Sequence, residues 1–155
     1  MKKLDINNAM YKQVLVAVDF SENSYLAIEK AQKMAKFCGA NIELIHVVEI
    51  PTYPILEDVA VMGMPGIWDD DIAKSLISAS DEKLKKLAND IDVISFKTIE
   101  GIASIDIVEY AKQNKCDLIV MGTHGVSGFK ALIGSTTNSI VNHACCDVLA
   151  VKLKD

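Results

Sequence analysis

The residues best suited to chemistry in this 155-residue chain gather in one glycine-rich segment, 122–134, which holds four of the eight glycines. Glycine lets the backbone approach an anion closely, and the first N–H groups of a following helix attract phosphate. Ser135, Thr136 and Thr137 follow the last glycine and add hydroxyl donors. The segment therefore predicts a phosphate site. The alternative is a surface loop with glycine turns and a Ser/Thr helix cap.

Asp19 is the second candidate, because it ends the apolar run Val14–Val18. Its carboxylate could accept hydrogen bonds from a ligand, or it could cap the helix that begins within Ser21–Ser24. The common phosphate motifs are absent. No glycine is followed by Lys, as a P-loop requires, and the turn after Val14–Val18 lacks the glycines of a dinucleotide fingerprint. A response-regulator receiver would also need an acidic cluster at this turn.

Apolar runs and helical periodicities alternate along the chain. The predicted strands are Val14–Val18, Ile42–Val48, Val93–Ile99, Leu118–Met121 and Val148–Val151. The predicted helices run from the Ser21–Ser24 cap to Gly39 and over Asp69–Asn89, Ser104–Lys115 and Ser135–His143. This alternation predicts an α/β fold, a five-stranded parallel sheet with helices on both faces. Asp19 and the glycine segment then meet at the carboxyl ends of the strands, where such sheets bind ligands.

Two strands are expected at the sheet edges. Ser95 and Lys97 interrupt the apolar pattern of the strand 93–99. The strand 148–151 is short, apolar and last in the chain. An uncovered apolar edge invites pairing with a second chain, so this final strand predicts a homodimer.

Composition narrows the class of protein. Sixteen cations against 21 anions give a net charge of −5, which argues against a nucleic-acid partner. All the cations are Lys, so a phosphate site must rely on amides, hydroxyls or Lys. We expect no signal peptide, no membrane helix and reduced thiols, hence a cytoplasmic protein. One domain, 1–155, is predicted, with an extension at 1–9 and a mobile loop at 51–66.

Four side chains have competing interpretations. His124, between two loop glycines, could be a general acid or base or an exposed loop histidine. Lys130 could reach a phosphate or be solvated. His46, inside an apolar strand, is expected to be a core histidine, and His143 to suit a helix C-terminus.

Over Met10–Lys152 the sequence resembles the universal stress protein family. The resemblance rests on Val-Leu-Val-Ala-Val-Asp-Phe-Ser at 14–21, Ile-His-Val-Val at 45–48, Asp-Leu-Ile-Val-Met-Gly-Thr-His-Gly at 117–125, Gly-Ser at 134–135 and Val-Leu-Ala-Val at 148–151. It implies a Rossmann-like fold of the adenine nucleotide alpha hydrolase-like type. It also implies dimerisation through the last strand.

The resemblance further implies an adenine nucleotide as ligand, ATP, ADP or AMP, with or without Mg²⁺. Asp19 would accept hydrogen bonds from the ribose, and the Val47 backbone would contact adenine. The phosphates would be surrounded by Gly122, Gly125, Gly134, Ser135 and Thr136. The family's nucleotide-binding branch carries Gly-x2-Gly-x9-Gly-Ser/Thr, whereas the second gap here, 126–133, has eight residues. The family branch that does not bind ATP therefore stays open.

Three functions remain. The first is a nucleotide-binding stress sensor without catalytic residues or a metal site. The second is a dimeric interaction protein that binds no nucleotide. The third is a slow ATP hydrolase in which Ser135 or His124 positions water. Because the chain has no Arg finger and one cation in the loop, we expect at most slow hydrolysis.

Overall fold

The computed structural model describes residues 10–50, 69–124 and 134–152. It contains a parallel sheet of five strands in the order β3-β2-β1-β4-β5. The strands are β1 (Gln13–Ala17), β2 (Asn41–Val48), β3 (Ser95–Glu100), β4 (Leu118–Gly122) and β5 (Asp147–Val151). The helices are α1 (Glu22–Cys38), α3 (Asp69–Asp90), α4 (Ala103–Gln113) and α5 (Ser135–His143). The predicted α/β fold is confirmed, whereas the predicted extension at 1–9 and loop at 51–66 lie outside the described residues.

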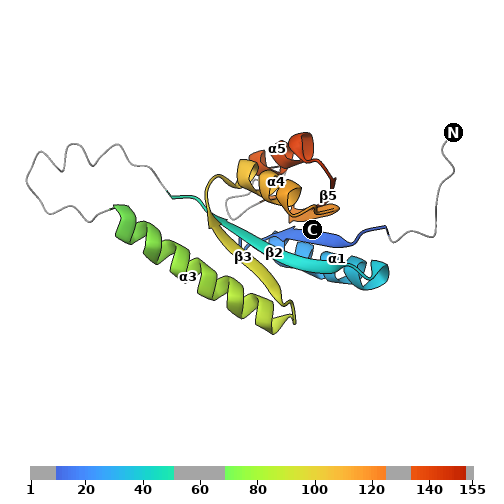
Figure 1. Ribbon diagram of the computed structural model, residues 1–155, viewed down its shortest axis with the longest axis horizontal. Helices are drawn as coiled ribbons and strands as arrows, with labels where there is room; N and C mark the ends of the chain where they lie inside the picture. Colours follow the sequence, from blue (N-terminus) through green and yellow to red (C-terminus); the bar gives the residue numbers. More distant parts are fainter. Residues whose placement is uncertain (1–9, 51–68, 125–133, 153–155) are drawn as a thin grey trace, which may run out of the picture.

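Two apolar layers enclose the sheet, one on each face, so β1 is buried on both faces. Val14, Val16 and Val18 point to the layer formed with α1 and α3. Leu15 and Ala17 point to the layer formed with α4 and α5. Figure 1 shows α4 and α5 above the sheet and α3 below it. The uninterrupted apolar run at 14–18 is therefore the sequence signature of a central strand.

The chain reverses its winding between β1 and β4. From β1 it passes through α1 to β2 on one side, and from β4 through α5 to β5 on the other. Val16 pairs with Val120, so Asp19 and Thr123 each lie three residues beyond this pair. Ala17 pairs with Ile45, so Val47 lies level with Asp19. The carboxyl ends of β2, β1 and β4 thus form a switch point, where open α/β sheets hold ligands.

Two predicted boundaries were wrong by two residues, and left-handed turns explain both. The third strand begins at Ser95 because Asp92 adopts φ +55° and Ile94 is 98% exposed in the turn that precedes it. Helix α4 ends at Gln113 because Lys115 adopts φ +52°. The Cys116 N–H then closes the helix end by donating to the Ala111 carbonyl. The predicted edge positions of β3 and β5 are confirmed.

Helices able to cross a membrane are absent from residues 10–50, 69–124 and 134–152, because none there is both long and apolar enough.

Candidate site at the carboxyl edge of the sheet

Asp19 fixes the start of α1. Its Oδ1 accepts hydrogen bonds from the Ser21 N–H at 3.0 Å and from the Ser21 hydroxyl at 2.5 Å. Ser21 is in turn the N-cap of α1, since its Oγ accepts from the Ser24 N–H at 3.2 Å. Asp19 therefore holds the cap residue through one carboxylate oxygen, while the capping role that the sequence offered as its alternative belongs to Ser21.

Phe20 turns the chain between Asp19 and Ser21, a role that the sequence analysis missed. It adopts φ +62°, a conformation that is uncommon for a bulky residue. The centroid of its ring lies 4.6 Å from the centroid of the His46 ring. The same centroid lies 4.2 Å from Lys83 Nζ. Contacts from β2 and α3 thus hold the strained turn in place. Positive φ at a phenylalanine has no sequence signal.

The two described glycines of the motif allow chain segments to approach each other. A Cβ on Gly122 would lie 2.6 Å from Asn23 Cβ, so the end of β4 can touch α1 only as glycine. A Cβ on Gly134 would lie 3.2 Å from the Thr123 carbonyl oxygen, to which the Gly134 N–H donates. Close packing between β4 and α1 is therefore sufficient to require glycine at position 122, with or without a ligand.

Helix α5 opens toward this edge without a side-chain cap. Its N-cap is Gly134, and the first helical hydrogen bond there joins the Asn138 N–H to the Gly134 carbonyl. Ser135 is exposed and Thr136 is half-buried. Thr137 is buried, and its hydroxyl donates to the Gly122 carbonyl at 3.0 Å. Thr137 is thus structural, while Ser135 and Thr136 lie at an uncapped helix end of positive potential.

Unpaired polar atoms are concentrated at the same edge. Among the described residues, three buried side-chain nitrogen or oxygen atoms lack a hydrogen-bond partner: Asn23 Oδ1, His124 Nε2 and Thr98 Oγ1. The first two belong to segments that touch, because Asn23 Nδ2 donates to the His124 carbonyl at 3.1 Å. His124 Nδ1 lies 2.9 Å from the Thr123 hydroxyl. The sequence did not single out Asn23. It did single out His124, as a general acid or base or an exposed loop histidine, and the structure places it half-buried.

The remaining candidates have mixed outcomes. Val47 pairs with Ile99 in β3 and packs against the core layer under α4, so its side chain is structural. His46 Nδ1 donates to the Val18 carbonyl at 2.7 Å, and His143 Nδ1 donates to the Ser139 carbonyl at 2.7 Å. The predicted structural roles of both histidines are thus confirmed. Gly125 and Lys130 lie outside the described residues.

Metal-ligating side chains do not cluster in the part of the chain that the structure describes, where no three His, Cys, Asp or Glu residues are placed to hold an ion. The four cysteines are free thiols. Burial, followed by nearby negative groups, raises the pKa of Cys116 and of Cys146 to about 11. Cys116 and Cys146 are therefore protonated at neutral pH.

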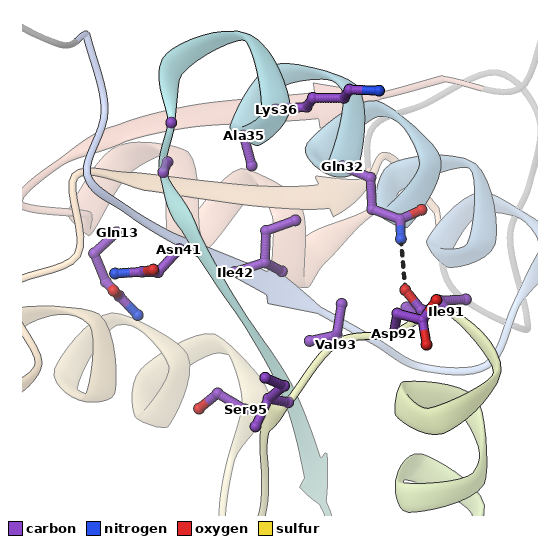
Figure 2. A pocket seen from close by; sticks show the side chains of 13 residues that line it. Gln13, Gln32, Ala35, Lys36, Asn41, Ile42, Ile91, Asp92, Val93 and Ser95 are labelled. Atoms are coloured by element: carbon purple, nitrogen blue, oxygen red, sulfur yellow. Dashed lines mark hydrogen bonds between the residues drawn. The ribbon is translucent and has the colours of Figure 1, made fainter.

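A wide groove lies at the other edge of the sheet, where the strands begin. It has a volume of about 850 Å³ and is lined by residues of α1, of the segment 91–94 between α3 and β3, and of the first positions of β1, β2 and β3. Figure 2 shows Gln13, Asn41 and Ser95 along it, with Gln32 Nε2 donating to the Ile91 carbonyl at 3.0 Å. This groove contains none of the predicted site residues.

Comparison with known proteins shows the family. A family model described as "Universal stress protein family" matches residues 10–152. Universal stress protein A homologs 1 and 2 of Coxiella burnetii are 33% and 34% identical to this chain over 148 residues. The alignments cover 94% and 93% of this chain and 99% and 97% of those proteins.

Solved structures show the same fold. Universal stress protein UspA from Lactobacillus plantarum superposes with a TM-score of 0.74 at 28% identity, covering 93% of this chain and 99% of that one. A universal stress protein solved in complex with cAMP superposes with a TM-score of 0.57 at 22% identity, covering 92% and 97%. With the family model spanning nearly the whole described chain and both relatives above 30% identity, this protein belongs to the universal stress protein family.

Proposed function

We propose that this protein is a cytoplasmic stress-response module that binds an adenine nucleotide at the carboxyl edge, between β1 and β4. The observation that carries the proposal is the uncapped N-terminus of α5, which opens beside the ends of these two strands. Such a helix end at a switch point attracts phosphate. The cAMP complex of a structural neighbour supports an adenine nucleotide as ligand.

In the proposed complex, the second carboxylate oxygen of Asp19 accepts hydrogen bonds from the ribose, since Oδ1 already serves Ser21. The Val47 backbone contacts adenine from its position level with Asp19. The phosphates lie among Gly122, Gly125, Gly134, Ser135 and Thr136. Amide and hydroxyl donors supply the binding energy, because the chain has no Arg.

Calorimetry tests this proposal directly. We expect micromolar affinity for ATP, ADP or AMP, about −8 kcal/mol. Titrations with and without Mg²⁺ determine whether the ion contributes. Mass spectrometry of small molecules released from the heat-denatured protein identifies a co-purified ligand. If no nucleotide gives heat at millimolar concentration, the alternative of a dimeric interaction protein without nucleotide is favoured.

Binding without efficient turnover is the proposed mode of action. Phosphoryl transfer needs charge stabilisation at the transferring group, and the chain offers no Arg for it. A single-turnover experiment with excess protein, labelled ATP and Mg²⁺ measures the hydrolysis rate. A rate of about 1 s⁻¹ or more, lost in His124→Ala, would favour the hydrolase instead.

We also propose a homodimer joined through β5. This strand lies at the end of the sheet, and Val148, Leu149 and Ala150 are only half-buried. Proline is tolerated poorly where an edge donor is paired, so Ala150→Pro should weaken the dimer. Light scattering at tens of micromolar should report a dimer for the unmodified protein and a larger monomer fraction for the variant. A monomeric unmodified protein would contradict the assignment.

A further inference from the structure

Two buried polar atoms at the carboxyl edge, His124 Nε2 and Asn23 Oδ1, have no hydrogen-bond partner among the described residues. Leaving such a group unpaired is destabilising, so two at one place need a reason. The two residues are joined by the bond from Asn23 Nδ2 to the His124 carbonyl. A ligand that pairs both atoms would recover this cost.

The hydroxyl of Thr123 determines what His124 Nε2 can do. Thr123 is 6% exposed, and its hydroxyl lies 2.9 Å from His124 Nδ1. If the hydroxyl donates to Nδ1, its proton is paired, and the ring proton of the neutral imidazole then sits on Nε2. The reverse arrangement would leave the buried hydroxyl proton without an acceptor. His124 Nε2 is therefore a donor that lacks an acceptor.

The amide of Asn23 has the opposite need. Its Nδ2 donates to the His124 carbonyl, and a flipped amide would place two acceptors against each other. Asn23 Oδ1 is therefore an acceptor that lacks a donor. The His124 backbone also passes close to the start of α5, because a Cβ on Gly134 would lie 3.8 Å from His124 Cα.

We propose that His124 and Asn23 select the ligand as a pair, His124 Nε2 donating to a phosphate oxygen and Asn23 Oδ1 accepting from an O–H group. This inference rests on the proposed nucleotide site and specifies its ligand as a phosphorylated ribose. Inorganic phosphate would satisfy only His124, and a nucleoside only Asn23. The O–H group is a ribose hydroxyl or a water bound to Mg²⁺, which share the same donor chemistry.

The experiment combines variants with truncated ligands in calorimetry. His124→Ala should bind AMP at least about tenfold more weakly than the unmodified protein, with its affinity for adenosine nearly unchanged. His124→Gln is the matched control, since its amide can still donate, and it should retain most of the affinity. Asn23→Ala should weaken AMP binding by about tenfold but leave 2′,3′-dideoxy-AMP unaffected.

Repeating the Asn23 titrations in EDTA and in Mg²⁺ separates the two sources of the O–H group. An effect that persists in EDTA and disappears with the dideoxy ligand identifies the ribose. An effect that appears only with Mg²⁺ identifies the metal-bound water. Circular dichroism melting checks that each variant is folded.

Two failures are distinguishable. If the unmodified protein binds AMP and both alanine variants bind it within twofold, the pair does not select the ligand and the nucleotide site stands. If the unmodified protein binds no nucleotide, the proposed function and this inference both fall. Should His124→Ala not fold, equal affinity of the unmodified protein for AMP and adenosine would overturn the phosphate contact.

Discussion

The two edges of the sheet differ in how they use space and hydrogen bonds. The amino edge holds a groove of about 850 Å³, and among the described residues none of the buried side-chain atoms without a partner belongs to its lining. Asp117 Oδ2 accepts from the Lys12 and Gln13 N–H groups at 2.7 and 2.8 Å, and Gln32 donates to the Ile91 carbonyl. At the carboxyl edge the segments are so close that Gly122 must be glycine, yet two buried polar atoms are unpaired.

Free volume is therefore a poor guide to function in this protein. Water fills an open groove at little cost, whereas a buried donor or acceptor without a partner is destabilising. A ligand would thus stabilise the carboxyl edge by pairing its buried groups, whereas it would stabilise the amino edge little. Each prediction below tests one of these two edges.

The largest effect is expected from Gly122→Val at the carboxyl edge. Even the first added carbon would lie 2.6 Å from Asn23 Cβ and 3.0 Å from the Asn23 carbonyl carbon. Overpacking of this kind should lower the free energy of unfolding by about 3 kcal/mol or more and abolish nucleotide binding. Urea denaturation and calorimetry measure the two effects.

Gly39→Ala provides the control for Gly122→Val. Gly39 ends α1 with φ +69°, and a Cβ there would meet nothing within 4 Å. It should cost only about 1 kcal/mol, the strain of a left-handed alanine, with nucleotide affinity unchanged. Equal losses in the two variants would show that close approach at Gly122 is unimportant.

The sequence predicted the fold because its signals are local and strong. The run Val14–Val18, the Ser21 cap and the Gly39 stop each act within a few residues. The meeting of Asp19 with the segment after β4 also followed, since parallel strands end at one edge. The features of the site that the sequence did not predict depend on contacts between distant segments. One is the contact of Asn23 with Gly122, which are about a hundred residues apart. Periodicity carries no information on such contacts, so the packing role of Gly122 was assigned to phosphate alone.

Ser135→Ala should have the next largest effect, on affinity rather than stability. Ser135 is exposed at the uncapped start of α5, so its hydroxyl is available to a phosphate. Loss of a hydrogen bond to a charged group should weaken nucleotide binding by about 1–3 kcal/mol. Asn41→Ala, in the groove at the amino edge, should leave the affinity unchanged. If Asn41→Ala weakens binding and Ser135→Ala does not, the two edges have been assigned the wrong way round.

Asp117→Ala should affect stability but not binding. Its carboxylate accepts two backbone N–H groups where β1 begins, and both would lose their partner. Because water can reach part of this site, we expect a loss of about 1–2 kcal/mol in the free energy of unfolding. Asp81→Ala, on the exposed side of α3, should change stability by less than about 0.5 kcal/mol. If the Asp117→Ala variant is folded but has lost its nucleotide affinity, the assignment of ligand binding to the carboxyl edge alone is contradicted.

The smallest effect concerns Tyr110 on α4, whose hydroxyl donates to Glu43 Oε1 at 2.9 Å. Burial, followed by this hydrogen bond and the charge of Glu43, raises the pKa of Tyr110 from 10.0 to about 12. The folded protein therefore holds the proton more tightly than the unfolded chain, so Tyr110 contributes stability fully below pH 10 and loses it as the pH rises toward 12. The urea midpoint of the unmodified protein should fall more steeply over this interval than that of Tyr110→Phe. The difference in absorbance at 295 nm between the two proteins isolates the phenol directly, and titration of Tyr110 near pH 10 would mean that its pairing with Glu43 does not persist in solution.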